Sequence, residues 1–261
     1  MENHVIKTQN LSVGYVRKNE TTVIASEIDI TLNSGKLIAL IGANGIGKST
    51  LLRTLTGIQK PVAGKVFLEN REIDRYNTQE LSQKMSVVLT EKLPPSNLSV
   101  LELVALGRQP YTNWIGKLSA EDFSKIENAI SLTQTDSLRD KKHYEISDGQ
   151  LQKVLIARAL AQDTPIIILD EPTTHLDLQH KASLFSLLKK LTVETGKSIL
   201  FSTHDMDLAL QLSDEIIIMT SQKTIQDSPE NCISSGILNE LFTDDNIFYD
   251  REKGKFMFKD I

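Results

Sequence analysis

The sequence predicts an α/β protein with a mainly parallel sheet, an N-terminal antiparallel β subdomain and an inserted helical lobe. Three observations support this fold class. Short continuous apolar runs alternate with helical patterns, β-prone segments gather at the N-terminus, and a long central stretch has helical patterns without a strong strand. We therefore expect a core formed by about residues 1–89 and 161–225, a helical lobe at about 90–160, and a C-terminal tail at 226–261.

Four apolar runs predict strands that are buried on both faces. Continuous apolar runs, rather than alternating ones, are typical of a parallel sheet covered by helices. Leucines from Leu184 to Leu191 recur at i, i+3, i+4 and i+7 and stop near Gly196, which predicts a helix between two of these strands. The four runs are Leu37–Ile41, Ile166–Leu169, Ile199–Phe201 and Glu215–Met219.

The two ends of the chain have patterns of their own. Val5–Val13 and Thr21–Leu32 are β-prone and are separated by the polar stretch Arg17–Glu20, which predicts a hairpin in an antiparallel sheet. From about Ser221 onward the pattern weakens, and we expect a terminal helix and a pair of strands.

Composition limits the function classes. The formal net charge of −5 is not the overall basic charge of a nucleic-acid-binding protein, so we expect no nucleic acid partner. The single cysteine, Cys232, cannot form an internal disulfide and is expected to be a packed or semi-exposed thiol. Because no apolar run reaches about 20 residues, we expect no segment that spans a bilayer.

A glycine-rich loop, Gly42–Ser49, follows one predicted strand and opens a helical pattern that stops at Gly57. In this strand–loop–helix context, backbone N–H groups and the helix N-terminus can surround the phosphates of a nucleotide. Lys48 is expected to reach the β- and γ-phosphates, the Ser49 hydroxyl to bind Mg²⁺, and Thr50 to contact the α-phosphate. The loop residues expected to contact the nucleotide are Gly42, Asn44, Gly45, Gly47, Lys48, Ser49 and Thr50.

Two acids, Asp170 and Glu171, close the apolar strand Ile166–Leu169 at the sheet edge where ligands bind in open α/β folds. Asp170 is expected to hold Mg²⁺, and Glu171 to orient and deprotonate an attacking water. Together with the glycine-rich loop, these acids predict a nucleotide hydrolase with a P-loop NTPase core.

A third motif, Ile146-Ser147-Asp148-Gly149-Gln150, lies at the start of a helical pattern about twenty residues before the acids. Here the chain resembles the ATP-binding subunit of an ABC transporter, whose signature is Leu-Ser-Gly-Gly-Gln. The resemblance implies ATP and Mg²⁺ as cofactors. It also implies that Ser147, Gly149 and Gln150 contact the γ-phosphate of an ATP bound by a second copy.

Further family landmarks follow in order along the chain. His204, at the end of an apolar strand, resembles the switch histidine that contacts the γ-phosphate. The segment Thr174–Asp177 resembles the loop that couples the two active sites across the dimer. Tyr15 resembles the aromatic that stacks on adenine, although a packed strand aromatic is an alternative.

Two positions depart from the family pattern. Asp148 replaces a glycine of the signature, and because an acid beside a phosphate is unfavourable, we expect its side chain to face solvent or the partner. Where the family has a metal-binding glutamine after the strand Ser86–Leu89, this chain has Thr90 followed by Glu91. Either Thr90 or Glu91 is a candidate metal ligand.

The stretches Leu103–Tyr111 and Asp170–Leu178 resemble the importer class that serves iron–siderophore, haem and vitamin B12 uptake. The resemblance implies a homodimer that closes on ATP and drives separate integral membrane permease subunits, with a substrate-binding protein as an indirect partner. It also implies a location at the cytoplasmic face of the bacterial inner membrane.

Three other classes of protein have a similar glycine-rich loop and are alternatives to an importer subunit. A soluble ABC-type ATPase acting on ribosomes or nucleic acid usually has two cassettes or a long coiled-coil insertion. An export subunit would be expected to have fused transmembrane helices or different lobe residues. A kinase would lack the signature and the switch histidine.

Overall fold

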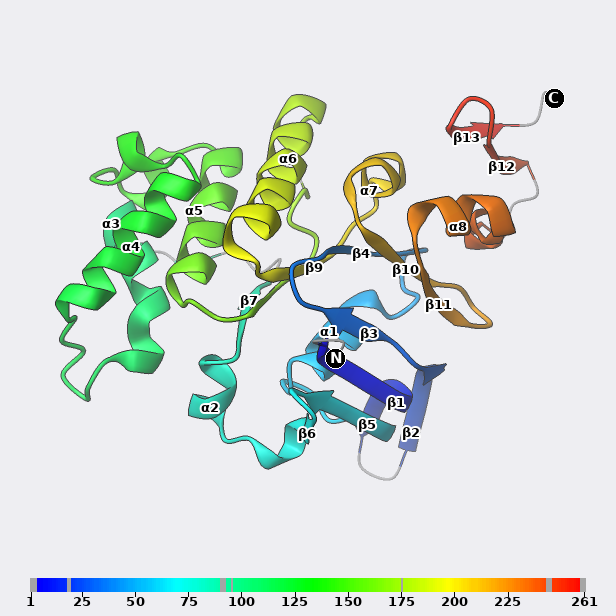
Figure 1. Cartoon of the computed structure of the whole chain (residues 1–261), viewed down its shortest axis with the longest axis horizontal. Coiled ribbons are helices and arrows are strands. Elements are labelled where there is room, and N and C mark those ends of the chain that lie inside the picture. The colour runs from blue at the N-terminus through cyan, green and yellow to red at the C-terminus, as the bar shows by residue number, and fades with distance from the viewer. Residues whose placement is uncertain are drawn as a thin grey trace. The chain divides into compact units, whose positions relative to one another are not determined.

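The computed structural model describes residues 4–17, 20–89, 93–94, 96–174, 176–242 and 246–258. The chain divides into two units (Figure 1). The first unit comprises residues 1–75 and 200–261, and the second comprises residues 76–199.

The first unit contains an antiparallel sheet with the strand order β2-β1-β5-β6, in which β3 also pairs with β1. The predicted hairpin is present, but Thr21–Leu32 is two strands rather than one. The buried Thr8 hydroxyl donates to Ile28 O at 2.7 Å and accepts from Ile30 N at 2.8 Å, which satisfies backbone groups where the strand breaks. The strands are β1 His4–Arg17, β2 Glu20–Ile28, β3 Thr31–Asn33, β5 Ala63–Leu68 and β6 Arg71–Glu72.

The first unit also contains a parallel pair, β4 Leu37–Gly42 and β10 Glu215–Met219, which confirms two of the predicted strands. All six residues of β4 are buried. Strand β11, Thr224–Asp227, extends this pair as an antiparallel hairpin with β10. The helical segments of the first unit that precede the C-terminal tail are α1 Lys48–Leu55, η1 Ile73–Arg75 and α7 Met206–Leu212.

The C-terminal tail has the predicted helix and strand pair. After α8, Pro229–Ser235, and η5, Ile237–Leu241, the strands β12 Ile247–Asp250 and β13 Lys255–Phe258 form a hairpin (Figure 1). Phe256 stacks edge-on against Phe242 and Tyr249, with ring centroids 5.2 and 5.1 Å apart. Burial is the main cause that raises the pKa of the Cys232 thiol to about 11, which fits the predicted packed thiol.

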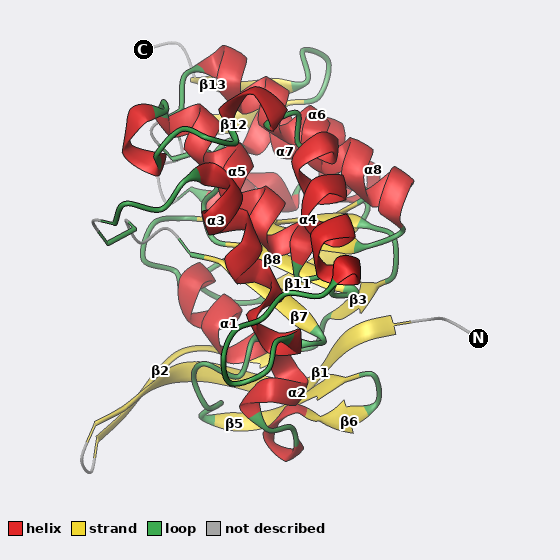
Figure 2. Cartoon of the chain, turned by 90° about the vertical axis from the view of Figure 1, so that its left-hand side faces the viewer, coloured by secondary structure: helices red, strands yellow, loops and turns green. Residues whose placement is uncertain are grey.

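The second unit combines a parallel strand pair with most of the helices. Strands β7 Met85–Val88 and β8 Ile166–Leu169 pair in parallel, and helices α3, α4 and α5 contact one another (Figure 2). Among the described residues from 93 to 165 there is no strand, only a bridge between Ser99 and Lys142. The helical segments are α2 Thr78–Ser82, α3 Val100–Ala105, η2 Leu106–Tyr111, α4 Ala120–Leu132, η3 Asp136–Leu138, η4 His143–Glu145, α5 Asp148–Ala161 and α6 Leu178–Thr195.

The apolar run Ile199–Phe201 lies in β9, Ser198–Ser202, which confirms the predicted strand. The chain passes between the two units within this strand. In the second unit Ser198 N donates to Pro165 O at 3.0 Å, and in the first unit Thr203 N donates to Leu40 O at 3.1 Å. Helix α6 ends at Gly196, which adopts the left-handed conformation at φ 66° and so terminates the predicted leucine helix.

Short polar motifs fix where several helices begin. A side chain at the N-cap accepts from the backbone of the residue three positions on, and that residue's side chain accepts from the N-cap backbone, so two unpaired N–H groups are satisfied. The pairs are Asn77 with Glu80, Ser99 with Glu102, Ser119 with Asp122, and Ser147 with Gln150.

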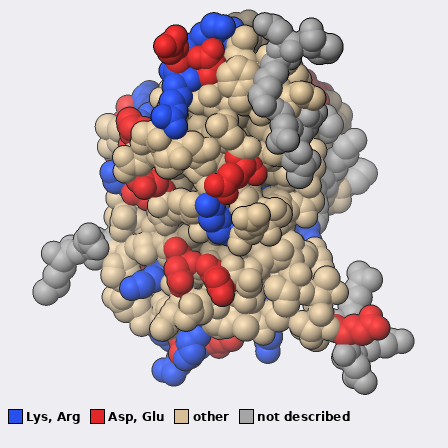
Figure 3. All heavy atoms as spheres, turned by 90° about the vertical axis from the view of Figure 1, so that its right-hand side faces the viewer, with Lys and Arg blue, Asp and Glu red and all other residues tan. Residues whose placement is uncertain are grey.

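Charged residues of both signs are interspersed on the face shown in Figure 3, in keeping with the formal net charge of −5. Among the helices that the structure describes, none has both the length and the apolar content required to cross a membrane.

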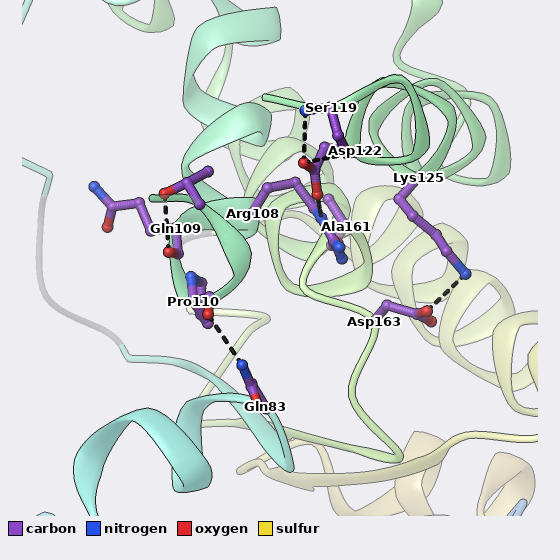
Figure 4. A network of polar contacts seen from close by, with 10 residues as sticks. Gln83, Arg108, Gln109, Pro110, Ser119, Asp122, Lys125, Ala161 and Asp163 are labelled. Carbon is purple, nitrogen blue, oxygen red and sulfur yellow. Dashed lines mark hydrogen bonds and ion pairs between the residues drawn. The ribbon is translucent and has the colours of Figure 1, made fainter. Parts of the chain in front are cut away.

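A buried ion pair joins the capping box of α4 to two other elements (Figure 4). Arg108 Nε donates to Asp122 Oδ1 at 2.8 Å, and Arg108 Nη1 donates to Ala161 O at 2.8 Å. The two charged side chains are 5% and 6% exposed. Hydrogen bonds from the backbone and hydroxyl of Ser119, followed by Arg108, lower the pKa of Asp122 to about 2.

Replacing Asp122 is expected to destabilise the protein strongly. Asp122→Ala leaves the Arg108 guanidinium buried without a counter-charge, which costs about 3–5 kcal/mol. Glu127→Ala, in the exposed pair with Arg139, is the matched control and should cost about 1 kcal/mol or less. Thermal denaturation of the two variants measures the difference, and equal losses would contradict a structural role for the buried pair.

The stability difference between wild type and Asp122→Ala is expected to depend on pH. Because the folded pKa of Asp122 lies below the ordinary value of 3.8, its ionised form stabilises the fold above about pH 4. This contribution is lost as the pH falls through about 2, so the gap between wild type and Asp122→Ala should narrow there.

Candidate functional site

The glycine-rich loop has the predicted strand–loop–helix geometry. Strand β4 ends at Gly42, and α1 begins at Lys48. Within the turn Ile46 N donates to Ala43 O at 3.3 Å, and Leu51 N donates to Gly47 O at 2.8 Å. Asn44 and Gly45 at the tip are exposed, so the loop presents its backbone to solvent at the N-terminus of a helix.

Two glycines in this loop are required by space or conformation. Gly47 has φ 109°, and a Cβ there would lie 2.6 Å from Ile24 Cγ2. Gly42 pairs with Met219 on β10, and a Cβ there would lie 2.7 Å from Met219 O. A side chain at either position would therefore displace the loop from its neighbouring strands.

Lys48 lies inside the loop rather than in solvent. Its side chain is buried, and Nζ donates to Gly42 O at 2.9 Å and to Ala43 O at 3.2 Å. This places a positive charge against the concave backbone of the loop. Ser49, at the second position of α1, is partly exposed at the same helix end.

Tyr15 reaches the same region from β1. Its hydroxyl lies 3.2 Å from Thr50 Oγ1, and its side chain is 43% exposed. The structure thus brings together two predicted site residues that are 35 positions apart. The partly exposed ring is available for stacking, although its hydroxyl is anchored on α1.

His204 follows β9 and is exposed. Because Thr203 N donates to Leu40 O, His204 comes after β9 at the level where β4 approaches the glycine-rich loop. In the first unit, the loop and His204 therefore follow the carboxyl ends of β4 and β9, the edge where ligands bind in open α/β sheets. Tyr15 approaches α1 from within the antiparallel strand β1.

The two acids lie in the second unit, at the end of β8. Asp170 is buried, and its N–H donates to Val88 O at 2.8 Å, which extends the pairing of β8 with β7. Glu171 has φ 47°, a left-handed conformation that is uncommon for a residue with a side chain. Its carboxylate accepts from Thr174 Oγ1 at 3.3 Å. Such backbone strain directly after a buried acid is a feature of functional sites.

The signature segment forms the start of α5, also in the second unit. Ser147 caps the helix and accepts from Gln150 N at 3.3 Å, while Gln150 Oε1 accepts from Ser147 N at 3.0 Å. Asp148 is exposed in the first turn, where a negative charge is favourable. This exposure agrees with the expectation that its side chain faces away from the protein interior.

The sequence analysis did not single out His180, which lies against the signature. A Cβ on Gly149 would lie 2.9 Å from His180 Cδ2, so glycine allows this close packing. His180 Nδ1 lies 2.7 Å from Asp177 Oδ1, and Asp177 caps α6 by accepting from His180 N. In the sequence, the one signal near His180 is Asp177, a residue type that often caps a helix. Gly149 and His180 are distant in the sequence, so the pattern of residues does not reveal their contact.

Three predicted positions lie outside the described residues. They are the two candidate metal ligands, Thr90 and Glu91, and His175 in the segment that follows the acids.

A family model described as ABC transporter matches residues 25–174, which include the loop, the signature and the acids. The chain belongs to the ABC transporter family. The family was expected from the order of the motifs, and the match confirms it.

Curated ABC transporter proteins align over nearly the whole chain. An uncharacterized ABC transporter ATP-binding protein of Methanocaldococcus jannaschii is 40% identical over 256 residues, which cover 98% of this chain and 87% of the relative. The iron(3+)-hydroxamate import ATP-binding protein of Bacillus subtilis is 35% identical, with 91% and 87% covered.

Solved structures of ABC transporters share the fold. A transporter described as of the metal-chelate type, in an inward-facing conformation, has a TM-score of 0.81 and 28% identity, with 98% of this chain and 96% of that chain covered. A dimeric bacterial ABC transporter cassette has a TM-score of 0.73 and 28% identity, with 86% and 98% covered. The predicted fold class, an α/β P-loop NTPase with parallel and antiparallel strands, is thereby confirmed.

Gly47→Ala is expected to weaken both folding and nucleotide binding. An alanine would be strained at φ 109° and would also collide with Ile24, at a cost of about 1–3 kcal/mol for the backbone strain alone. Gly45→Ala is the control, because Gly45 has φ 77° but no atom within 4 Å of a Cβ.

Thermal denaturation and nucleotide titration of both variants separate the strain from the collision. Adding Ile24→Ala to Gly47→Ala should recover part of the loss and should not help Gly45→Ala. Equal losses for the two single variants would refute the importance of the Ile24 contact.

Proposed function

We propose that this chain is the ATP-hydrolysing subunit of an ABC importer that powers uptake of an iron chelate (siderophore), haem or vitamin B12 through separate membrane subunits. The observation that carries the proposal is the glycine-rich loop with Lys48 buried against its carbonyl groups, in a chain that also has the signature and the paired acids. The cargo class is supported by similarity to the iron(3+)-hydroxamate import protein.

In this proposal the first unit holds the nucleotide. The backbone of Gly42, Gly45 and Gly47, with Asn44 beside them, surrounds the phosphates, and Lys48 moves from its carbonyl partners to the β- and γ-phosphates. Thr50 contacts the α-phosphate, and the Tyr15 ring stacks on adenine.

The side chains proposed to hold Mg²⁺ are of the chemical type that this ion prefers. The hydroxyl of Ser49 and the carboxylate of Asp170 are oxygen donors, the ligand type that Mg²⁺ prefers, and Thr90 or Glu91 would add a third. The ion would neutralise charge that develops on the phosphates during transfer.

Glu171 is proposed to act as the general base. Its carboxylate would accept a proton from the attacking water, and the strained backbone holds the side chain at the end of β8. His204 is proposed to donate a hydrogen bond to the γ-phosphate and so to stabilise the charge that develops on it.

A second copy is proposed to complete each active site. Ser147, Gly149 and Gln150 lie at the N-terminus of α5, where backbone N–H groups and the helix dipole favour an anion. These groups would contact the γ-phosphate of ATP bound by the other copy. The dimeric structure of a related cassette supports the dimer, and the contact itself is part of the proposal. Hydrolysis therefore depends on dimerisation.

The cassette pair is proposed to work with integral membrane permease subunits at the cytoplasmic face of the membrane, and indirectly with a substrate-binding protein. We propose the division into a core at about 1–89 and 161–225, a helical lobe at about 90–160, and a tail at 226–261. Closure of the ATP-bound dimer would move the lobes and so shift the permease between its access states.

Glu171→Gln is expected to retain ATP binding and lose most turnover. Removing a general base typically lowers the rate by about 10²–10⁴-fold, whereas the amide keeps the size and polarity of the side chain. Phosphate release measures turnover, and ATP titration measures binding. A variant with near wild-type turnover would remove Glu171 from the proposed mechanism.

Lys48→Ala is expected to weaken ATP binding itself. Loss of hydrogen bonds from a charged group costs about 1.5–3 kcal/mol, which corresponds to roughly 10–100-fold in affinity. Lys60→Ala removes the same charge from an exposed site after α1 and should leave the affinity unchanged. Equal affinity of Lys48→Ala and wild type in calorimetric titration would contradict the proposed role of the loop.

A further inference from the structure

A histidine of α6 occupies the space beside the signature glycine. A Cβ on Gly149 would lie 2.9 Å from His180 Cδ2, 3.4 Å from Cγ and 3.7 Å from Nε2. The Cδ2 edge of the imidazole ring therefore faces the first turn of α5. Both residues belong to the second unit, so the contact lies within one compact part of the chain.

The backbone conformation of Gly149 does not by itself require glycine. Its φ lies outside the left-handed region, unlike that of Gly45 and Gly47 in the glycine-rich loop. The preceding position of the signature, Asp148, carries an exposed side chain. The first turn of α5 thus accepts a side chain at one of these two positions and has glycine at the other, where the His180 ring fills the space.

Two hydrogen bonds to one carboxylate hold the ring in place. Asp177 Oδ1 accepts from His180 N at 2.8 Å and lies 2.7 Å from His180 Nδ1. The bond from the His180 backbone, followed by that from its side chain, lowers the pKa of Asp177. An ionised carboxylate can only accept, so Nδ1 carries a proton and donates it to Asp177. This bond directs the opposite edge of the ring to Gly149.

The ring contacts α5 where the helix has N–H groups that it does not use itself. An α-helix leaves four N–H groups without intrahelical partners at its start. In α5 the capping box satisfies two of them, because Ser147 N donates to Gln150 Oε1 and Gln150 N donates to Ser147 Oγ. The other two belong to Asp148 and Gly149. Since anions bind at such groups, the place of Gly149 decides where a phosphate oxygen can be held.

We propose that His180 is a positioning residue for the signature. Held by Asp177, its ring sets the place of the Gly149 N–H group and the orientation of the first turn of α5. The inference rests on the proposed function, in which this turn contacts the γ-phosphate of ATP bound by the other copy. It adds a residue outside the signature that each copy needs in order to close on the ATP of its partner.

The contribution of His180 to catalysis is expected to exceed its contribution to folding. The side chains of His180 and Asp177 are 54% and 66% exposed, and exposed pairs contribute little to stability. A displacement of about 1 Å in a group that binds the reacting part of a substrate can lower a rate ~100-fold. Turnover and unfolding temperature should therefore respond differently when the ring is removed.

The first test compares His180→Ala with wild type in the full chain. The kcat for ATP hydrolysis should fall about 10-fold, and the unfolding temperature should fall by no more than about 4 °C. The affinity of the monomer for ATP, measured at low chain concentration, should be unchanged because the glycine-rich loop lies in the first unit. Gln179→Ala removes an exposed side chain from the same turn of α6 and should match wild type in all three measurements.

Dimerisation gives a readout that does not depend on turnover. In a Glu171→Gln background, which is expected to bind ATP without hydrolysing it, analytical ultracentrifugation measures ATP-dependent dimer formation. His180→Ala should raise the dissociation constant of this dimer about 10-fold, because the first turn of α5 no longer presents its N–H groups correctly. Wild-type kcat or wild-type dimerisation for His180→Ala would overturn the proposal.

A conservative variant separates positioning from a structural role. His180→Asn can still donate to Asp177 from an amide nitrogen near the place of Nδ1, and its amide oxygen lies near the place of Cδ2. It should recover most of the kcat that His180→Ala loses. If His180→Asn is as slow as His180→Ala, or if kcat follows the unfolding temperature across the variants, the role of His180 is structural and the proposal fails.

A second-site change tests the contact itself. Gly149→Ala should lower kcat ~100-fold, because the new Cβ would collide with the His180 ring and displace the signature. Adding His180→Ala vacates that space and should raise kcat to about the level of His180→Ala alone, which is a non-additive result. If the phosphate itself requires glycine at this position, the second change would lower kcat further, and that result would overturn the proposal.

The two levels of the inference fail separately. A wild-type chain that neither hydrolyses ATP nor dimerises with it would refute the proposed function. Normal hydrolysis and dimerisation of wild type, with the same values for His180→Ala, would refute only the role of His180.

Discussion

The pairing of β4 with β10 is the constraint on which the nucleotide-binding part of the first unit depends. Gly42 lies opposite Met219, and the Met219 carbonyl leaves no room for a Cβ there. The chain can therefore turn only through a residue without a side chain, directly where the buried strand ends. This turn determines where α1 begins. It also brings the Lys48 side chain onto the carbonyl groups of Gly42 and Ala43.

The second unit depends on a different kind of constraint. Arg108 joins the capping box of α4 to η2 and to the last residue of α5, and its burial makes the pairing with Asp122 obligatory.

The predicted site residues divide between the two units. The first unit carries the loop, Tyr15 and His204, while the second carries the acids and the signature. The loop, His204 and the acids follow buried strands, and the signature lies at the start of a helix. Tyr15 lies within the antiparallel strand β1.

Spacing in the sequence was sufficient to determine the local structures and the order of the motifs. The loop at Gly42–Ser49, the strand that ends at Leu169 before the acids, the helix that stops at Gly196 and the cap formed by Ser147 and Gln150 all depend on residues a few positions apart. Only the tertiary structure showed that Thr8 divides the second N-terminal segment into two strands, that Tyr15 meets Thr50, and that His180 packs on Gly149. It alone showed that Arg108 is buried against Asp122 and the Ala161 carbonyl. The physical reason is that hydrogen bonding and desolvation of a side chain depend on neighbours that the fold brings from distant parts of the chain, and local spacing does not encode them.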